Sequence, residues 1–127
     1  MTRLPPSLER DLIPRLCRAG PLTLDLFHRD AQIGGDWLRL HPREFGVLWR
    51  LAETPGAIVD KRTLLADVWR LDYEPETNSL EVHVARLRKK LARFDFAWLI
   101  ETGVDGGYRL RVKDVPGVFS FSDDGGG

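Results

Sequence analysis

The stretch "ETNSLEVHVARLRKKLARF", residues 76–94, carries the strongest structural signal in this chain of 127 residues. Its apolar residues recur at helical spacing, which predicts an amphipathic helix with one buried face, formed by Leu80, Val84, Leu87 and Leu91. The other side of this helix is polar and basic. Residues 82–94 contain five Lys/Arg side chains and no acid, although the whole chain is formally neutral. Such a concentration of positive charge predicts a polarised surface suited to a polyanion.

The composition is that of one globular domain with short tails. The single cysteine, Cys17, excludes an intramolecular disulfide framework and suits a reducing compartment. The N-terminus has no long apolar run behind its charges, and no stretch of eighteen apolar residues occurs. We therefore expect a cytoplasmic protein without a membrane segment.

The region before the helices alternates apolar and polar residues with period two. The segments 22–26, 29–33 and 36–40 follow this pattern, and Gly34–Gly35 is a typical hairpin turn between the last two. A small antiparallel sheet with one solvated face is the structure that this pattern predicts.

From residue 41 the period becomes helical. The stretch "HPREFGVLWRLAETPG" places Pro42 at the first position of a helix, and a short strand is expected at residues 57–59. Asp60 is a suitable N-cap for a second helix. After the polar loop "RLDYEPETN", Asn78 and Glu81 resemble a capping box for the third helix.

The segments "AWLIET", "GVDGG" and "YRLRV" then predict a closing β-hairpin with a glycine-rich tip. A helix pair followed by a hairpin is the winged helix-turn-helix arrangement, in which the last helix enters a DNA groove and the hairpin is the wing. The predicted fold class is therefore α+β. We expect a flexible leader at 1–20, a winged-helix domain at 21–113 and a flexible tail at 114–127.

The residues from "LHPREFGVLW" to "VHVARLRKKL", followed by "LIETGVDGGYRL", resemble the OmpR/PhoB-type winged-helix DNA-binding domain. This is the effector domain of many bacterial two-component response regulators, and the resemblance covers about residues 21–112. It implies a four-stranded N-terminal sheet, three helices and a wing, with the third helix reading the major groove of double-stranded DNA. It also implies a sequence-specific transcriptional regulator that binds direct DNA repeats as a tandem homodimer.

The sequence departs from the family pattern in three places. The 20 leader residues are too few for a receiver domain, which predicts an effector domain that is either stand-alone, as the initial Met1 favours, or excised. The arginine pair common in the third helix is here Ala85–Arg86. At the wing, Val104 occupies the position of a common arginine, and Asp105 adds a negative charge.

The candidate DNA contacts lie on the third helix and the hairpin. Arg86 is the candidate for bidentate guanine recognition and Val82 for contact with a thymine methyl group. His83 and Arg88 are candidates for phosphate contacts, the histidine through a neutral imidazole N–H, although a partly buried histidine and a solvated arginine remain open. The predicted set is Ser79, Val82, His83, Arg86, Arg88, Lys90, Arg93, Thr102 and Arg109.

The loop before the third helix is acidic. The resemblance makes it a candidate contact for RNA polymerase, through Asp72, Tyr73, Glu74 and Glu76. An ordinary solvated loop is an equally good interpretation.

The sequence offers no support for an enzyme. The histidines and Cys17 lack metal-site spacing, and no phosphate-binding loop or dinucleotide fingerprint is present, so we expect no cofactor and no metal. The alternative function is a winged-helix adaptor for protein–protein interaction with weak or no DNA binding, which the altered wing and Ala85 favour.

Overall fold

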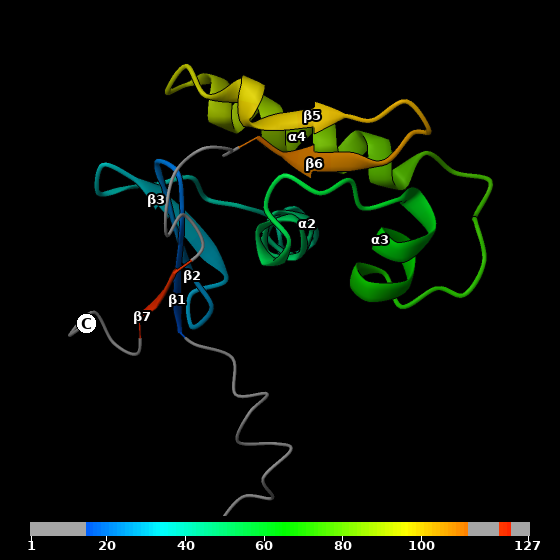
Figure 1. Cartoon of the computed structure of the whole chain (residues 1–127), viewed down its shortest axis with the longest axis horizontal. Helices are drawn as coiled ribbons and strands as arrows, with labels where there is room; N and C mark the ends of the chain where they lie inside the picture. Colours follow the sequence, from blue (N-terminus) through cyan, green and yellow to red (C-terminus); the bar gives the residue numbers. More distant parts are fainter. Residues whose placement is uncertain (1–14, 112–119, 123–127) are drawn as a thin grey trace, which may run out of the picture.

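A computed structural model describes residues 15–111 and 120–122 of the chain (Figure 1). The N-terminal part is an antiparallel sheet with the strand order β4-β3-β2-β1-β7. Its strands are β1 (Leu16–Ala19), β2 (Leu22–Asp25), β3 (Asp30–Ile33), β4 (Asp36–Trp37) and β7 (Ser120–Ser122). The expected N-terminal sheet is confirmed, because the period-two apolar residues Leu22, Leu24, Ala31 and Ile33 all point into the core.

The hairpin turn at Gly34–Gly35 is also confirmed. Both glycines have positive φ angles, 59° and 91°, in the left-handed region that glycine enters without steric cost. No other atom would lie within 4 Å of a Cβ at either position, so backbone conformation alone explains the two glycines.

Two strands lie in segments that the sequence assigned to the leader and the tail. β1 pairs with β2 in a register that joins Cys17 to Leu24 and Ala19 to Leu22. Cys17 and Ala19 are fully buried, so this strand completes the core face of the sheet. β7 pairs with the other edge of β1. The predicted leader boundary therefore falls too late, and the remaining leader and tail lie outside the described residues.

Three helices follow the sheet: α2 (Pro42–Glu53), α3 (Lys61–Val68) and α4 (Ser79–Ala92). Pro42 is the first residue of α2, as predicted, and His41 is its N-cap. Asp60 caps α3 by accepting a hydrogen bond of 2.7 Å from the backbone N–H of Thr63. The predicted capping box of α4 is wrong, because Asn78 makes no side-chain cap bond and the carboxylate of Glu81 lies 2.9 Å from Lys61 Nζ.

The wing consists of β5 (Ile100–Thr102) and β6 (Tyr108–Leu110), preceded by the short 3-10 helix η1 (Ala97–Leu99). The strand expected at 57–59 is a single bridge between Val59 and Tyr108. This bridge joins the segment between α2 and α3 to the wing.

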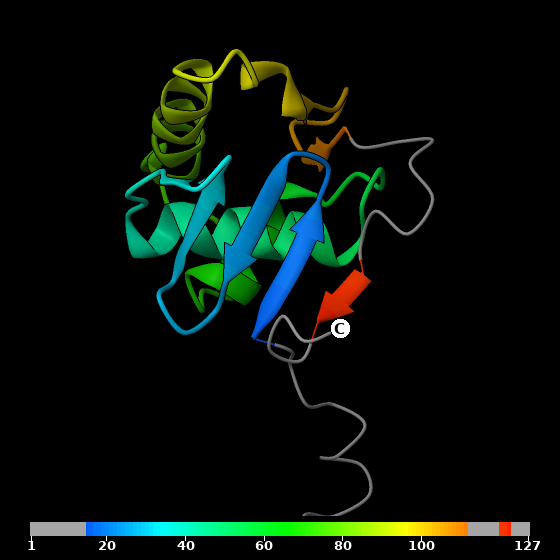
Figure 2. The same ribbon diagram turned by 90° about the vertical axis from the view of Figure 1, so that its left-hand side faces the viewer.

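α2 is the centre of the molecule, with the sheet on one side, α3 on the other and the wing above it (Figure 1). Figure 2, which faces the sheet, shows α2 crossing behind the strands and α4 beside it. Fully buried leucines from every layer meet around α2, among them Leu24, Leu48, Leu64, Leu87 and Leu110. None of the helices described in the structure is long and apolar enough to cross a membrane.

Candidate nucleic-acid interface

The exposed basic side chains of α4 lie on its outer side. Its inner side packs into the core through Leu80, Val84 and Leu87, whereas Arg86 and Lys89 are exposed and Val82 is half-buried. Arg93 is also exposed at the end of the helix, with its guanidinium carbon 5.3 Å from the centre of the Phe94 ring. A shallow depression beside α4 gathers Arg86, Lys89 and Arg93 with His41 from the start of α2.

Arg88 faces the wing. Its Nε donates to the backbone oxygen of Ile100 at 3.0 Å, and its Nη2 donates to Thr102 Oγ1 at 2.7 Å. The guanidinium carbon lies 5.5 Å from the centre of the Tyr108 ring. The structure thus brings together two of the predicted contacts, Arg88 and Thr102, as a brace between α4 and β5.

Lys90 faces α2. Its ammonium lies 2.6 Å from Glu44 Oε1 and 2.8 Å from the backbone oxygen of Arg39. The side chain of Glu44 is only 2% exposed, and the same Oε1 accepts a hydrogen bond of 2.9 Å from the backbone N–H of His41. Its charge is therefore compensated within the protein, unlike that of Lys89.

Ser79 and His83 form a short polar chain with Trp69 at the end of α3. The indole Nε1 donates to Ser79 Oγ at 3.2 Å. His83 Nδ1 lies 2.8 Å from the backbone oxygen of Ser79. The edge of Trp69 meets the His83 ring at 5.3 Å between ring centres. These contacts fix the half-buried ring of His83 on the outer side of α4.

Among the residues that the structure describes, the base of the wing contains paired charges, whereas its tip does not. Arg109 pairs with Glu101 across the two strands, and Arg111 Nε lies 3.9 Å from the other oxygen of Glu101. At the tip, Val104 and Asp105 are exposed, so this part of the hairpin presents one apolar and one negative side chain.

A second ion pair links α3 to α4 behind the interface. Burial opposes ionisation of Glu81, but the hydrogen bond and charge of Lys61, together with a backbone hydrogen bond, outweigh it, and the pKa of Glu81 lies below its ordinary value. The same bond raises the pKa of Lys61. Both groups therefore stay charged at neutral pH and hold α4 against α3.

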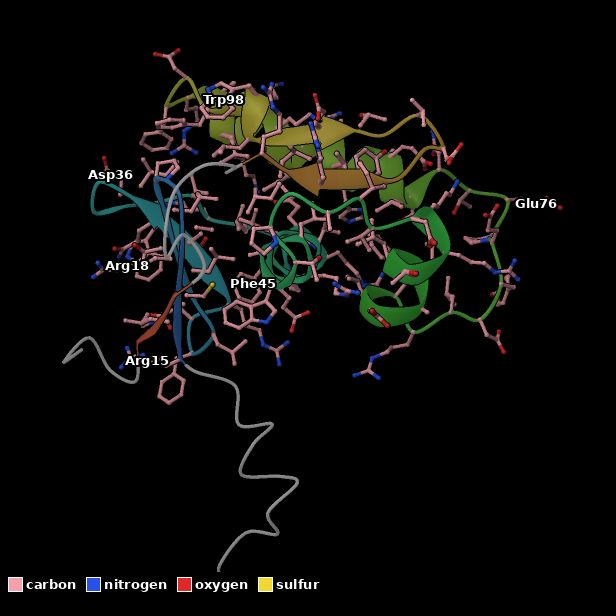
Figure 3. All side chains as sticks on the ribbon, in the orientation of Figure 1. Arg15, Arg18, Asp36, Phe45, Glu76 and Trp98 are labelled. Carbon is pink, nitrogen blue, oxygen red and sulfur yellow. The ribbon has the colours of Figure 1, made fainter. Side chains whose placement is uncertain are left out.

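The acidic loop between α3 and α4 projects from the body of the protein. Asp72, Tyr73, Glu74 and Glu76 are all exposed. Figure 3 shows Glu76 at the far end of the loop, pointing away from the helices.

Sequence reasoning missed two residues of this surface. Lys89 was not among the predicted contacts, although its helical position next to Arg86 is the signal that identifies it. His41 was missed because its place beside α4 depends on a tertiary contact: its ring centre lies 5.0 Å from that of His83. Within the described part of the chain, no three His, Cys, Asp or Glu side chains are grouped to hold a metal ion.

Comparison with known proteins gives consistent matches. Residues 35–110 match the family model described as "Transcriptional regulatory protein, C terminal". The transcriptional regulatory protein BasR of Escherichia coli (strain K12) is 40% identical over 74 residues, which cover 58% of this chain and 33% of BasR. The heme response regulator HssR of Staphylococcus aureus (strain JH9) is 31% identical over 92 residues, covering 72% of this chain and 41% of HssR. The chain thus spans less than half the length of these relatives.

Two solved structures with the same fold are domains of comparable size. The DNA-binding domain of RstA from Klebsiella pneumoniae, in complex with the RstA box, matches with a TM-score of 0.65 and 33% identity over 76% of this chain and 97% of that one. The DNA-binding domain of CpxR from E. coli matches with a TM-score of 0.67 and 27% identity over 76% and 95%.

Proposed function

The chain belongs to the OmpR/PhoB-type family of DNA-binding transcription regulators, and on this premise we propose that it binds double-stranded DNA with α4 in the major groove. The observation that carries the proposal is the outer side of α4, where Val82, Arg86 and Lys89 project away from the core beside a wing. An α-helix fits the major groove, and side chains on its outer side reach base edges and phosphates.

We assign the exposed side chains either to contacts with bases or to contacts with phosphates. Arg86 has no partner among the described residues, so both of its terminal nitrogens are available for the O6 and N7 acceptors of guanine. Val82 is placed to contact a thymine methyl group. Lys89 and Arg93 lie at the flank of the helix and supply affinity by displacing counterions from phosphates.

The remaining predicted contacts support the surface indirectly. Arg88 and Thr102 hold the wing against α4, and Arg109 is paired with Glu101. Lys90 anchors α4 to α2 through Glu44. Ser79 bonds to both Trp69 and His83 and so positions the His83 ring at the start of the helix.

The assembly on DNA is part of the same proposal. We place two copies in tandem on direct repeats about one helical turn, roughly 10–11 base pairs, apart, so that both lie on one face of the duplex. The exposed loop with Asp72, Tyr73, Glu74 and Glu76 is free to meet RNA polymerase, and the protein acts in the bacterial cytoplasm.

The test is selection of bound sequences from a random duplex pool, followed by salt-titrated affinity measurements. Arg86→Ala should weaken specific binding by about 1–3 kcal/mol and relax preference at one base pair. Arg18→Ala is the matched control, because Arg18 is exposed on the sheet, on the opposite side of α2 from α3 (Figure 3). Equal affinities for wild type, Arg86→Ala and Arg18→Ala would reject α4 as the reader.

The second candidate is a winged-helix adaptor that binds protein. Ala85 is exposed where many relatives by resemblance have an arginine, and the wing tip presents Val104 and Asp105. The same salt titration separates the two functions, since contact with phosphates makes affinity fall steeply with salt concentration. Absence of any salt-dependent binding to the pool would favour the adaptor.

A further inference from the structure

The imidazole of His83 is half-buried and fixed in one orientation between α4, the start of α2 and the end of α3. Trp69 meets the ring edge-on, with an interplanar angle of 82°, and His41 lies against it at an angle of 58°. A ring flanked on two sides presents its hydrogen-bonding atoms in fixed directions.

The hydrogen bond to Ser79 determines which nitrogen of His83 carries the proton. Nδ1 lies 2.8 Å from the backbone oxygen of Ser79, one turn earlier in the helix. A carbonyl oxygen only accepts, so Nδ1 must donate. In the neutral ring the other nitrogen, Nε2, is then an acceptor, and within residues 15–111 it has no hydrogen-bond partner.

His41 has the opposite arrangement. Its Nδ1 accepts a hydrogen bond of 3.0 Å from the backbone N–H of Arg43, as the cap of α2. The hydrogen of the neutral His41 ring is therefore on Nε2, which donates. The neighbouring rings therefore offer a DNA ligand one acceptor, Nε2 of His83, and one donor, Nε2 of His41.

An acceptor on α4 needs a donor on DNA. Phosphate oxygens only accept, so a neutral His83 cannot bind one through Nε2. In the major groove the donors are the exocyclic amino groups, N6 of adenine and N4 of cytosine. We propose that neutral His83 reads the amino group of an adenine or cytosine, next to the base pair read by Arg86, which lies three residues on along the same side of the helix. This inference rests on the proposed function.

Protonation would reverse this preference without disturbing the fold. A proton added at Nε2 leaves the bond from Nδ1 to Ser79 intact and turns the acceptor into a donor. The rings against His83 are His41, at the start of α2, and the neutral Trp69, at the end of α3. The guanidinium carbon of Arg43 lies 5.0 Å from the centre of the Trp69 ring, and Glu44, Arg86 and Lys90 line the same depression as His41. Glu44 is paired with Lys90. His41 already presents a donor at Nε2, because its Nδ1 accepts the cap bond from Arg43.

The experiment is selection from a random duplex pool at about pH 8 and about pH 5.5, a range over which an imidazole can gain a proton. We expect the wild-type protein at high pH to prefer adenine or cytosine at one position beside the Arg86 base pair by about tenfold, and to lose most of that preference at low pH. His83→Ala should lack the preference at both pH values. His83→Lys, a permanent donor, should show the low-pH selection at both.

The control is Arg18→Ala, which lies exposed on the sheet and leaves His83 and its neighbours Trp69 and His41 in place. It should retain the preference and its pH dependence, and urea unfolding of each variant shows whether α4 is intact. A preference that persists in His83→Ala, or that is the same at both pH values in wild type, would overturn the inference while leaving the proposed function standing. A pool with no enriched sequence at either pH would overturn both.

Discussion

At the scale of single residues, Lys89 and Lys90 show how one position along a helix separates binding from stability. Lys89 is exposed, whereas the ammonium of Lys90 is bonded to the buried carboxylate of Glu44. Removing one partner of a buried ion pair leaves the other charge uncompensated, which costs far more than losing an exposed charge. The two lysines therefore have different functions despite their adjacent positions.

We expect Lys90→Ala to lower the free energy of unfolding by about 2 kcal/mol, because it strands the Glu44 carboxylate. Lys89→Ala should leave stability unchanged and reduce the slope of log affinity against log salt by about one unit. Urea unfolding and salt-titrated DNA binding of both variants check this. If Lys90→Ala instead changes the salt slope and not the stability, its ammonium contacts phosphate in the complex.

The pairing of Lys90 could not have been predicted from the sequence. Glu44 has a local explanation as an acid in the first turn of α2, and Lys90 has one as part of a basic helix. Their contact joins residues that are 46 positions apart, and no local pattern reports such a separation. The bond from Arg88 to Thr102 could not be predicted for the same reason. The burial of Leu80, Val84 and Leu87, in contrast, could be predicted from their helical spacing.

At the scale of elements, the connection from β2 to β3 is held by one carboxylate. Asp25 Oδ2 lies 2.8 Å from His28 Nδ1, and Oδ1 accepts a hydrogen bond of 2.9 Å from the backbone N–H of Phe27. Arg15 Nε lies 3.5 Å from the same carboxylate. Burial raises the pKa of Asp25, but the hydrogen bonds and charge of His28 outweigh it, so this pKa lies below its ordinary value.

A carboxyl whose pKa is lower in the folded than in the unfolded state stabilises the fold fully above its unfolded pKa, about 3.9. This contribution is lost as pH falls through the folded pKa. Asp25→Asn should therefore lower stability by about 1 kcal/mol at neutral pH and weaken the acid-side decline. Urea unfolding from about pH 6 down to pH 3 measures both. A variant with an unchanged acid-side decline would show that other carboxyls control it.

The Arg88 brace joins α4 to the wing through hydrogen bonds to Ile100 and Thr102. We expect Arg88→Lys, which keeps the charge but loses the two-pronged bonding to β5, to lower stability by about 1 kcal/mol. Its salt slope in DNA binding should stay unchanged, since the number of cationic side chains is the same. Thr102→Val is the matched variant, because it removes only the Oγ1 acceptor. Full stability in both variants would contradict the brace.

The boundaries of an element could be predicted where a proline, a capping residue or a glycine pair marks them, and not elsewhere. The start of α2 is marked by Pro42 and the start of α3 by Asp60. The turn between β3 and β4 is marked by the Gly34–Gly35 pair. β1 was missed, since its four residues follow Pro14 and pair mainly through the backbone with β2 and β7. The α4 cap was wrong because Asn78 has φ −101° and ψ 41°, outside the extended conformation that a capping side chain requires.

At the scale of the whole molecule, the fold converts a neutral chain into a polarised one. Arg86 and Lys89 lie exposed on the outer side of α4, while Asp72, Glu74 and Glu76 extend from the loop before it. Of the five Lys/Arg side chains in residues 82–94, Arg88 and Lys90 are bonded within the protein. Affinity for DNA therefore depends on few free charges, which makes the wing tip the place where one added charge has most effect.

Val104 and Asp105 at this tip are exposed. An arginine in a narrow A·T-rich minor groove gains from its negative potential, whereas a valine cannot and an aspartate is repelled by the flanking phosphates. Val104→Arg should strengthen binding by on the order of 1 kcal/mol, more on A·T-rich flanks. Asp105→Asn should help less and without sequence preference. Affinities for one selected site with A·T-rich or G·C-rich flanks, at fixed salt, measure this. Weaker binding by Val104→Arg would mean that the wild-type valine already makes a contact in the complex.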